Sequence, residues 1–274
     1  MRSSCAAEKI RPPAVAGTFY PAQRDRLQAE VERLLATVAG GVEAAPKAVI
    51  APHAGYIYSG AIAAHAFAAL RAALLASPRP ASWDIARVVV IGPAHYVAVD
   101  GIALPDIDAF ETPLGRAPVD RDALAMLHDL PFVITADPPH APEHALEVEL
   151  PFLQVLGAPF SLVPLLVGEA TPAQVGQVLE RLWNAATFVI SSDLSHYLDY
   201  EAARRRDAAT AAIIEGGDWK RLSGNDACGY LAVAGLLMQV ARHGLTAKRL
   251  ALGNSGDTAG SRDRVVGYGA WAFA

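Results

Sequence analysis

The chain has 274 residues, of which 53% are hydrophobic and 19% are charged. This length and composition suffice for a full hydrophobic core, and we expect residues 1–274 to form a single domain. The formal net charge is −5 at pH 7, because 28 acidic side chains outnumber 23 basic ones. An acidic balance of this kind disfavours the binding of nucleic acid through a basic face.

Cysteine content and the distribution of apolar stretches indicate the cellular compartment of the protein. Cys5 and Cys228 are the two cysteines, and Cys5 lies near the N-terminus, so we expect no structural disulfide. The longest uncharged stretches, 48–70 and 151–168, are interrupted by prolines and are not typical of membrane helices. No apolar stretch follows the N-terminal charges, as a signal peptide would require. We therefore predict a soluble cytoplasmic protein that does not bind membranes.

Hydrophobic periodicity predicts strands that alternate with helices along the chain. The expected elements, in chain order, are a helix at 24–38 closed by Gly40 and Gly41, a strand at 48–51, a helix at 59–76, a loop at 77–82, a strand at 87–91, a β-rich excursion at 97–118, a short helix at 120–130, a short strand at 132–135, a helix from 142 to before 157 kinked at Pro151, a strand at 161–167, a helix at 172–185, a strand at 187–191, helices at 200–215 and 226–243, and a strand at 264–273. This order predicts an α/β fold with a mostly parallel central sheet flanked by helices on both faces.

Three histidines each follow a short apolar run of the strand type. His53 follows the run at 48–51, His95 follows the run at 88–91, and His196 follows the run at 188–190 after a longer turn. Continuous Val and Ile runs are typical of parallel strands that are buried on both faces. Because ligands bind beyond the carboxyl ends of such strands, we expect the three imidazoles to face one cleft. A metal site or an acid–base site would result.

Cys228 and Asp193 could belong to the same site, but each has an alternative interpretation. Cys228 lies at a predicted helix start, where the helix dipole stabilises a thiolate that could bind a metal. Free cysteines are also commonly small buried core residues. Asp193 precedes His196 by three residues and could orient an imidazole or cap the following segment.

Side chains around the histidines suggest a supporting layer. Glu143 and Glu147 share a face of a predicted helix, and His144 lies beside them without the H-E-x-x-H spacing of zinc proteases. We expect Glu143 and His144 to support the site or a helix terminus. Tyr56 and Tyr58 follow His53 and either line a pocket or pack in the core. We expect His65, His128 and His243 to be surface or core residues. His140 lies in a proline-rich loop and carries no functional signal.

Eight short motifs follow one another along nearly the whole chain: Arg11–Pro21, Ala51–Tyr56, Gly92–His95, Glu143–Phe152, Ser191–His196, Cys228-Gly229, Asn254–Asp257 and Val265–Tyr268. Together they resemble the Memo family, which is known in bacteria and archaea as protein B of the AmmeMemoRadiSam system. Each motif alone would be a weak signal, whereas the ordered set is specific.

The resemblance implies a fold related to the class III extradiol (LigB-type) dioxygenases, which hold non-haem iron with two histidines and a glutamate. It implies His53, His95 and Cys228 as metal ligands, with His196 beside the metal. A thiolate would then replace the glutamate, and this softer ligand set suits iron or copper, and also zinc. The resemblance further implies AMMECR-type and radical-SAM proteins as partners, and eukaryotic relatives are associated with phosphotyrosine peptides.

Three functions are consistent with these features. The favoured one is an iron- or copper-dependent redox enzyme acting on O₂ or a small organic substrate, with His196 as acid–base catalyst near the carboxylate of Asp193. A second is a non-enzymatic adaptor that binds a metal or a peptide in the same cleft. A third is a zinc hydrolase that activates a metal-bound water.

Overall fold

A mixed β-sheet forms the centre of the protein. The computed structural model describes residues 7–38, 44–75 and 86–274. Within these residues, nine strands form the main sheet in the order β10-β12-β2-β9-β3-β8-β4-β7, with β11 also paired to β12. The strands are β2 (Ala48–Ala51), β3 (Ala86–Pro93), β4 (Ile102–Leu104), β7 (Val133–Thr135), β8 (Phe160–Val167), β9 (Thr187–Ser191), β10 (His196–Leu198), β11 (Ala247–Asn254) and β12 (Val265–Phe273).

Parallel pairing is confined to part of this sheet. Strands β2, β9, β3 and β8 are parallel neighbours, whereas β12 runs antiparallel to β2, β10 and β11. Strand β4 is antiparallel to β8 and parallel to the edge strand β7. The predicted α/β class is confirmed, but the sheet is only partly parallel. Strands β11 and β12 are consecutive in the chain with no α-helix between them. Their pairing is therefore antiparallel, since parallel neighbours need a crossover connection.

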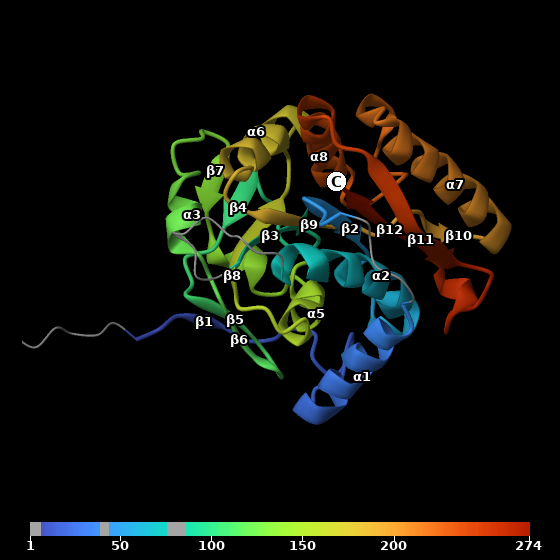
Figure 1. The fold of residues 1–274 in the computed structure, drawn as a ribbon, viewed down its shortest axis with the longest axis horizontal. Helices are drawn as coiled ribbons and strands as arrows, with labels where there is room; N and C mark the ends of the chain where they lie inside the picture. The colour runs from blue at the N-terminus through green and yellow to red at the C-terminus, as the bar shows by residue number, and fades with distance from the viewer. Residues whose placement is uncertain (1–6, 39–43, 76–85) are drawn as a thin grey trace, which may run out of the picture.

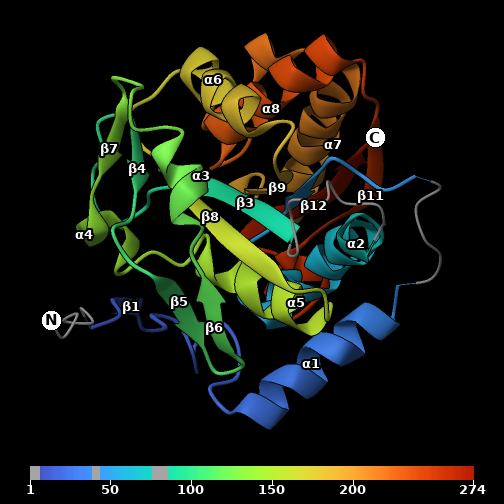
Figure 2. The ribbon, with the colours of Figure 1, turned by 60° about the vertical axis from the view of Figure 1, so that its left-hand side comes forward.

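Helices cover both faces of the sheet (Figures 1 and 2). One face packs on the first group of helices, α1 (Arg24–Ala36), α2 (Tyr56–Leu75) and α5 (Leu150–Val155). The opposite face packs on the second group, α3 (Arg121–Ala125), α6 (Pro172–Leu182), α7 (Tyr200–Gly216) and α8 (Tyr230–His243). Val49 of β2 faces the first core and Ile50 faces the second, as the two-residue period of a strand requires.

A smaller sheet lies beside the main one. It consists of β1 (Ile10–Arg11), β5 (Ala109–Thr112) and β6 (Gly115–Pro118), with β1 parallel to β5 and β5 antiparallel to β6. Strands β4 to β6 confirm the predicted β-rich excursion at 97–118. Strand β1 brings the N-terminal segment to this sheet, next to the short helix α4 (Asp137–His140).

The predicted helix from 142 to before 157 is confirmed only in its C-terminal part, α5, and is wrong for residues 142–146. Residues 141–142 form a bend, Glu143 and His144 have no regular structure, 145–146 form a turn, a 3₁₀ turn covers Glu147–Glu149, and α5 begins only at Leu150. Pro151 lies in the first turn of α5, where its missing N–H costs no helical hydrogen bond, so it starts this helix and does not kink it. The irregular stretch at 141–146 leaves Glu143 and His144 free to reach the main sheet.

Other boundaries differ from the prediction by a few residues. Helix α2 begins at Tyr56 and α8 begins at Tyr230, while α3 is shorter than the predicted helix at 120–130. Strands β10 and β11 were not predicted. Cys5, Gly40, Gly41 and the loop at 77–82 lie outside the described residues.

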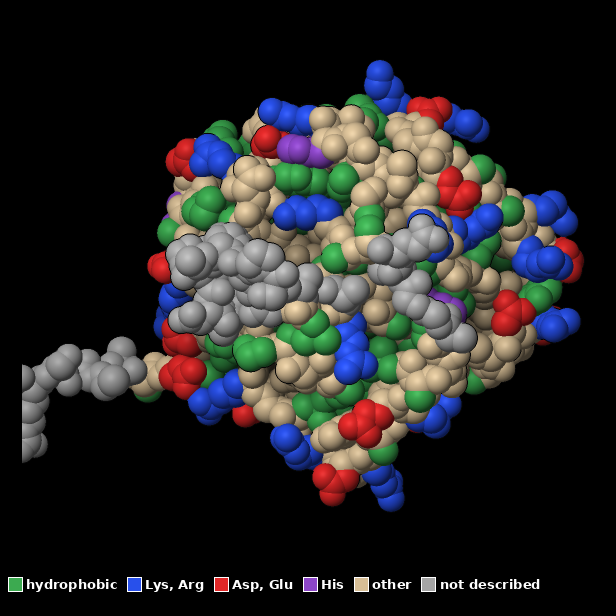
Figure 3. All heavy atoms as spheres, viewed as in Figure 1, with side chains coloured by type: hydrophobic (Ala, Val, Ile, Leu, Met, Phe, Trp, Pro, Cys, Tyr) green, Lys and Arg blue, Asp and Glu red, His purple; other side chains and the backbone are tan. Residues whose placement is uncertain are grey.

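Helix α2 is long and apolar enough to cross a membrane by length and composition alone. It packs against α1, β2 and β12, and Phe67, Leu70 and Leu74 belong to the core, whereas Ile57 and Leu75 at its ends are exposed. A helix that is hydrophobic on most sides is expected at such a position in a globular protein. On the face seen in Figure 3, acidic and basic side chains are interspersed over the surface.

A buried ion pair attaches the N-terminal segment to the main domain. The guanidinium of Arg11, in β1, pairs with the carboxylate of Glu147, and both side chains are buried. Arg11 also donates from Nε to the carbonyl oxygen of His140 at 2.9 Å and from Nη2 to that of Glu143 at 2.6 Å. One arginine therefore fixes three points of the segment 140–147.

The Glu147 carboxylate is surrounded by donors. Besides Arg11, it accepts hydrogen bonds from the backbone N–H groups of Ala14 (2.7 Å) and Val15 (3.1 Å) and from the Tyr20 hydroxyl (2.5 Å). Burial and the Glu147 charge raise the pKa of Tyr20, which keeps its hydroxyl a donor. A buried carboxylate is stable only with such complete pairing.

Replacing Arg11 with Met should destabilise the fold strongly, because it leaves the Glu147 charge buried without its cation. We expect a loss of about 3–5 kcal/mol in the free energy of unfolding, measured by urea denaturation. The matched control is Arg33→Met, since Arg33 pairs with Glu30 on the exposed side of α1. The control should lose less than about 1 kcal/mol. Equal losses in the two variants would contradict the assigned role of Arg11.

His140 should make stability depend on pH. Its side chain is buried, Nε2 lies 3.1 Å from the carbonyl oxygen of Ala103, and burial lowers its pKa to about 4. The unfolded chain takes up this proton below about pH 6.5, whereas the folded chain does so only near pH 4, so stability falls as pH decreases through this range.

Substitution His140→Gln should therefore reduce the loss of stability between pH 7 and pH 4.5. We expect a reduction of about 2 kcal/mol relative to wild type, measured by urea denaturation at both pH values. The exposed His128, replaced in the same way, serves as the control and should change little. A wild-type pH dependence in His140→Gln would show that this ring does not stay neutral in the fold.

Candidate metal centre

His53 occupies the loop that follows β2. Its side chain is buried, and its backbone N–H donates to Asp193 Oδ1 at 2.9 Å. The ring nitrogen Nδ1 lies 2.7 Å from Ser191 Oγ, at the carboxyl end of β9. The other ring nitrogen, Nε2, lies 3.4 Å from Cys228 Sγ. Neighbouring parallel strands thus hold one side of the imidazole while the other side faces a thiol.

His95 occupies the loop that follows β3. Its backbone N–H donates to Glu143 Oε2 at 2.6 Å, and Nδ1 lies 2.9 Å from Glu143 Oε1. Hydrogen bonds from the backbone and ring of His95 hold the pKa of Glu143 below its ordinary value against the effect of burial. Nδ1 therefore donates to an ionised carboxylate, which leaves Nε2 free to act as a ligand. The His53 and His95 ring centroids lie 5.2 Å apart.

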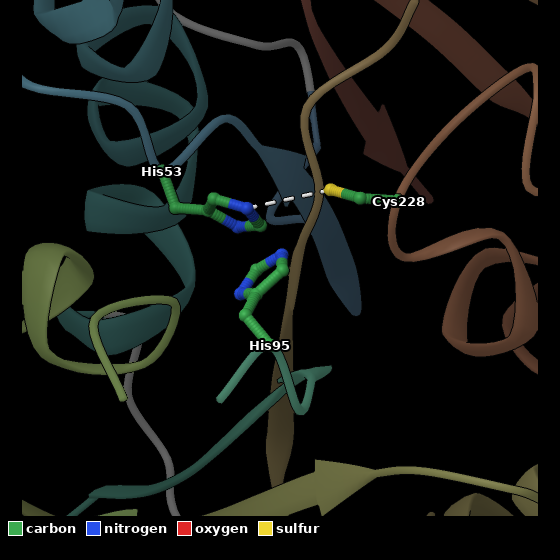
Figure 4. Close-up of side chains that lie close together, drawn as sticks. All are labelled: His53, His95 and Cys228. Atoms are coloured by element: carbon green, nitrogen blue, oxygen red, sulfur yellow. Dashed lines mark hydrogen bonds between the residues drawn. The ribbon is translucent and has the colours of Figure 1, made fainter. Parts of the chain in front are cut away.

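Cys228 lies just before α8. Its backbone N–H donates to the carbonyl oxygen of Asp193 at 3.3 Å, and its sulfur accepts the Asp193 N–H at 3.3 Å. These bonds join the loop before α8 to the turn after β9. Figure 4 shows the Cys228 sulfur directed toward the rings of His53 and His95.

These three side chains have the arrangement of a metal-ligand set. One ligand atom from each of His53, His95 and Cys228 lies within 4.8 Å of the others. Imidazole nitrogen and thiolate sulfur together suit iron, copper or zinc. The Glu143 carboxylate on the far nitrogen of His95 is the usual second layer of a metal-bound histidine. The residues present therefore fit a transition-metal ion.

Burial favours the uncharged forms of His53 and Cys228 in the absence of a cation. Burial, with the neighbouring histidines, lowers the pKa of His53 well below its ordinary value. Burial and the Asp193 charge raise the pKa of the Cys228 thiol to about 12. The thiolate stabilisation expected from the helix dipole is thus outweighed by burial. A bound cation would supply the positive charge that a thiolate needs here.

Asp193 supports the backbone of the site. Its side chain is 5% exposed, and burial raises its pKa to about 7, opposed by hydrogen bonds from the backbone N–H groups of His53 and Ala54. These contacts differ from both roles expected from the sequence. The carboxylate orients the turn after β2, whereas the sequence suggested that it would orient an imidazole or cap the next segment.

His196 begins strand β10 and is partly buried. Burial and the charge of His95 lower its pKa, so the two imidazoles lie within electrostatic range of each other. His196 is not part of the three-ligand group. The next residue, Tyr197, has a φ of 61°. A positive φ is uncommon for a tyrosine and marks local strain at this edge of the site.

His144 lies against both ligand histidines. Its ring stacks on His95 with centroids 4.8 Å apart and an interplanar angle of 18°, and it meets His53 edge-on at 5.4 Å. Burial lowers its pKa to about 4. His95, Glu143 and His144 form a second group of ligand atoms within 4.8 Å of one another. Because Glu143 and His144 are not in a helix, both side chains can lie against His95.

A cleft of about 430 Å³ opens beside the site. His144 and Asp193 line it together with aromatic and polar residues from loops far apart in the chain: Phe19, Ala54, Gly55, Tyr58, Tyr197, Ser255, Gly260, Ser261, Arg264, Val266 and Tyr268. Tyr56 is not among them; it is 4% exposed and donates from its hydroxyl to the carbonyl oxygen of Val148 at 2.7 Å. Of the two tyrosines considered for a pocket, Tyr58 lines it and Tyr56 packs in the core.

Sequence reasoning missed two residues that contact the site. Ser191 ends the apolar run of β9 and touches His53, and Glu149 touches Ser191. A serine that closes a buried apolar strand is a weak signal of a functional position. Glu149 gave no signal, because the segment containing it resembled the polar side of an amphipathic helix.

The fold and the ligand set define an α/β protein with a candidate metal centre at the carboxyl ends of its parallel strands. A family model of Memo-like proteins matches residues 11–272. A MEMO1 family protein of Aeropyrum pernix is 36% identical over 284 residues, covering 95% of this chain and 98% of that protein. MEMO1 family proteins of Thermotoga neapolitana and Thermoplasma volcanium are 33% and 30% identical, each over 94% of this chain and 98% and 96% of their own lengths. The chain belongs to the Memo family.

Replacing Glu143 with Gln should weaken metal binding, because the His95 ring loses its ionised acceptor. We expect the affinity for Fe²⁺ to fall by about 10- to 100-fold, measured by anaerobic calorimetric titration. Glu169→Gln is the control, since Glu169 is exposed on the loop after β8. Unchanged affinity in Glu143→Gln would mean that His95 is not a ligand or that its orientation does not depend on Glu143.

Proposed function

We propose that this Memo-family protein binds one iron or copper ion through His53, His95 and Cys228 and acts as a redox enzyme. The observation that carries the proposal is the convergence of two imidazoles and one thiol at the carboxyl ends of β2 and β3 and the start of α8. A ligand set that contains sulfur favours redox-active iron or copper over hard cations such as Mg²⁺.

The chain itself would orient the ligands and hold protons near the metal. Glu143 fixes the ring of His95, and Ser191 contacts the far nitrogen of His53. When bound, the metal would supply redox and Lewis-acid chemistry at this place. We assign the acid–base role to His196, with Asp193 as the carboxyl group of the preceding turn, because burial lowers the pKa of this imidazole and so favours its neutral, proton-accepting form.

The cleft suits a small organic substrate or the end of a peptide. Phe19, Tyr58 and Tyr268 give it aromatic walls, and the Arg264 guanidinium lies 5.0 Å from the centroid of the Tyr197 ring. Aromatic walls favour planar groups, and a cation at the rim favours anionic ones. His144 and Asp193 lie between this cleft and the ligand set.

We also propose a location and partners for the protein. We assign it to the cytoplasm on its cysteine content and its proline-interrupted apolar stretches. We assign AMMECR-type and radical-SAM proteins as its partners, because the chain resembles protein B of the AmmeMemoRadiSam system. Cell fractionation would test the first assignment, and co-purification of tagged protein from its native host would test the second.

Metal analysis of anaerobically purified protein tests the proposed function. We expect iron or copper bound to wild type, and a loss of most of it in His53→Ala and Cys228→Ser, since each removes one of three ligands. His128→Ala is the control, because this exposed histidine lies away from the site. His196→Gln should keep the metal and lose O₂- or substrate-dependent turnover.

Three results would count against this assignment. Unchanged metal content in His53→Ala and Cys228→Ser would exclude the ligand set. Loss of metal in His196→Gln would make His196 a ligand. Bound zinc with hydrolytic turnover, in place of iron or copper with O₂ consumption, would replace the redox function with that of a zinc hydrolase.

A further inference from the structure

Glu149 is a buried carboxyl group that the proposed function does not use. It is fully buried, and its Oε1 lies 2.8 Å from Ser191 Oγ. Its Oε2 has no hydrogen-bond partner within the described residues. The ion pairs found in the described part of the chain do not include Glu149. An ionised carboxylate in these surroundings would lack almost all of the stabilisation that Glu147 receives.

The Ser191 hydroxyl fixes the positions of the protons in this region. Its oxygen lies 2.6 Å from the carbonyl oxygen of Ala145, 2.7 Å from His53 Nδ1 and 2.8 Å from Glu149 Oε1. A hydroxyl has one proton to donate and two lone pairs to accept with. The Ala145 carbonyl can only accept, so the hydroxyl proton belongs to that contact. The other two neighbours must then donate.

We propose that Glu149 is a neutral carboxylic acid that donates to Ser191 and so holds His53 as its Nδ1–H tautomer. The Nε2 lone pair of His53 is then directed toward Cys228 Sγ, 3.4 Å away. Glu149 is a positioning residue, which acts on His53 through Ser191. The proton assignment stands on its own geometry, and its consequence for metal binding rests on the proposed function.

The ionised alternative fits the same distances poorly. If Ser191 donated to a Glu149 carboxylate, its lone pairs would face the Ala145 carbonyl oxygen at 2.6 Å, where two acceptors repel each other. Burial and the charge of Asp193 also raise the pKa of Glu149 well above its ordinary value. The contact distances and the raised pKa therefore both favour the neutral form of Glu149.

The two ligand histidines are thus held in different ways. His95, whose side chain is 28% exposed, donates to the ionised Glu143, whereas the buried His53 donates to a neutral hydroxyl supported by a neutral acid. A carboxylate partner makes an imidazole a stronger donor to metal than a hydroxyl does. Because Ser191 and the protonated Glu149 are both neutral, this arrangement also avoids a second buried negative charge near Asp193.

Two spectroscopic measurements on the metal-free protein test the proton assignment at neutral pH. Infrared spectroscopy should detect the carbonyl stretch of a protonated carboxylic acid in wild type, and this band should be absent in Glu149→Gln. Nitrogen-15 NMR should show His53, assigned with His53→Gln, as the Nδ1–H tautomer. Absence of the acid band, or an Nε2–H tautomer in wild type, would overturn the proposal.

Matched variants separate positioning from a structural role. Glu149→Gln retains an N–H donor toward Ser191 and should keep the tautomer and the Fe²⁺ affinity. Glu149→Leu removes the donor and should lose the tautomer preference and about 10- to 100-fold in Fe²⁺ affinity. Gln154→Leu on α5 is the control, because Gln154 bonds to Thr112 and Gly115 away from the site.

The variant results have distinct meanings. Equal Fe²⁺ affinity and an unchanged tautomer in Glu149→Leu would overturn the positioning role. If Glu149→Leu does not fold, the infrared and NMR results on wild type and Glu149→Gln decide the question. Failure of wild type to bind any metal would refute the proposed function while leaving the tautomer result intact.

Discussion

The arrangement of the site depends on one buried charge, the carboxylate of Glu147. Arg11, two backbone N–H groups and the Tyr20 hydroxyl surround it, so the N-terminal segment closes over the segment 140–149. Removing either charge of the Arg11–Glu147 pair leaves the other uncompensated in the core, which is far more costly than replacing both. These contacts hold the segment 140–149, which has little regular secondary structure of its own, in one conformation.

Three glutamates of this segment have three different tasks. Glu147 anchors the N-terminal segment, Glu143 accepts from the ring of His95, and Glu149 lies against Ser191 behind His53. Their environments explain the division, since Glu147 has a cation, Glu143 has several N–H donors, and Glu149 has neither. Position relative to donors therefore decides which carboxyl group is ionised. The candidate ligands His53 and His95, in the loops after β2 and β3, depend on this segment for their orientation.

Much of the fold and part of the site could be predicted from local sequence. The strands that precede His53 and His95 are continuous Val and Ile runs, which have few alternatives to a buried parallel strand. The helix at Pro142 was mispredicted because Glu143 and Glu147 have helical spacing, although tertiary hydrogen bonds to Arg11 and His95 keep this segment out of a helix. Strand β11, partly exposed on most residues, had too weak a hydrophobic pattern to be recognised.

The sequence by itself determined the α/β class, the central strands and the position of His53 and His95 directly after two of them, because a continuous apolar run and the residues that follow it are local properties. The family resemblance already grouped Cys228 with these histidines and placed His196 beside them, but the residues alone left the role of Cys228 open, and only the tertiary structure brings the three side chains together. The tertiary structure also decided that Tyr58 and not Tyr56 lines the cleft. Those outcomes depend on how loops from distant strands meet. Burial, which no single segment specifies, also raises the pKa of Cys228, Asp193 and Glu149.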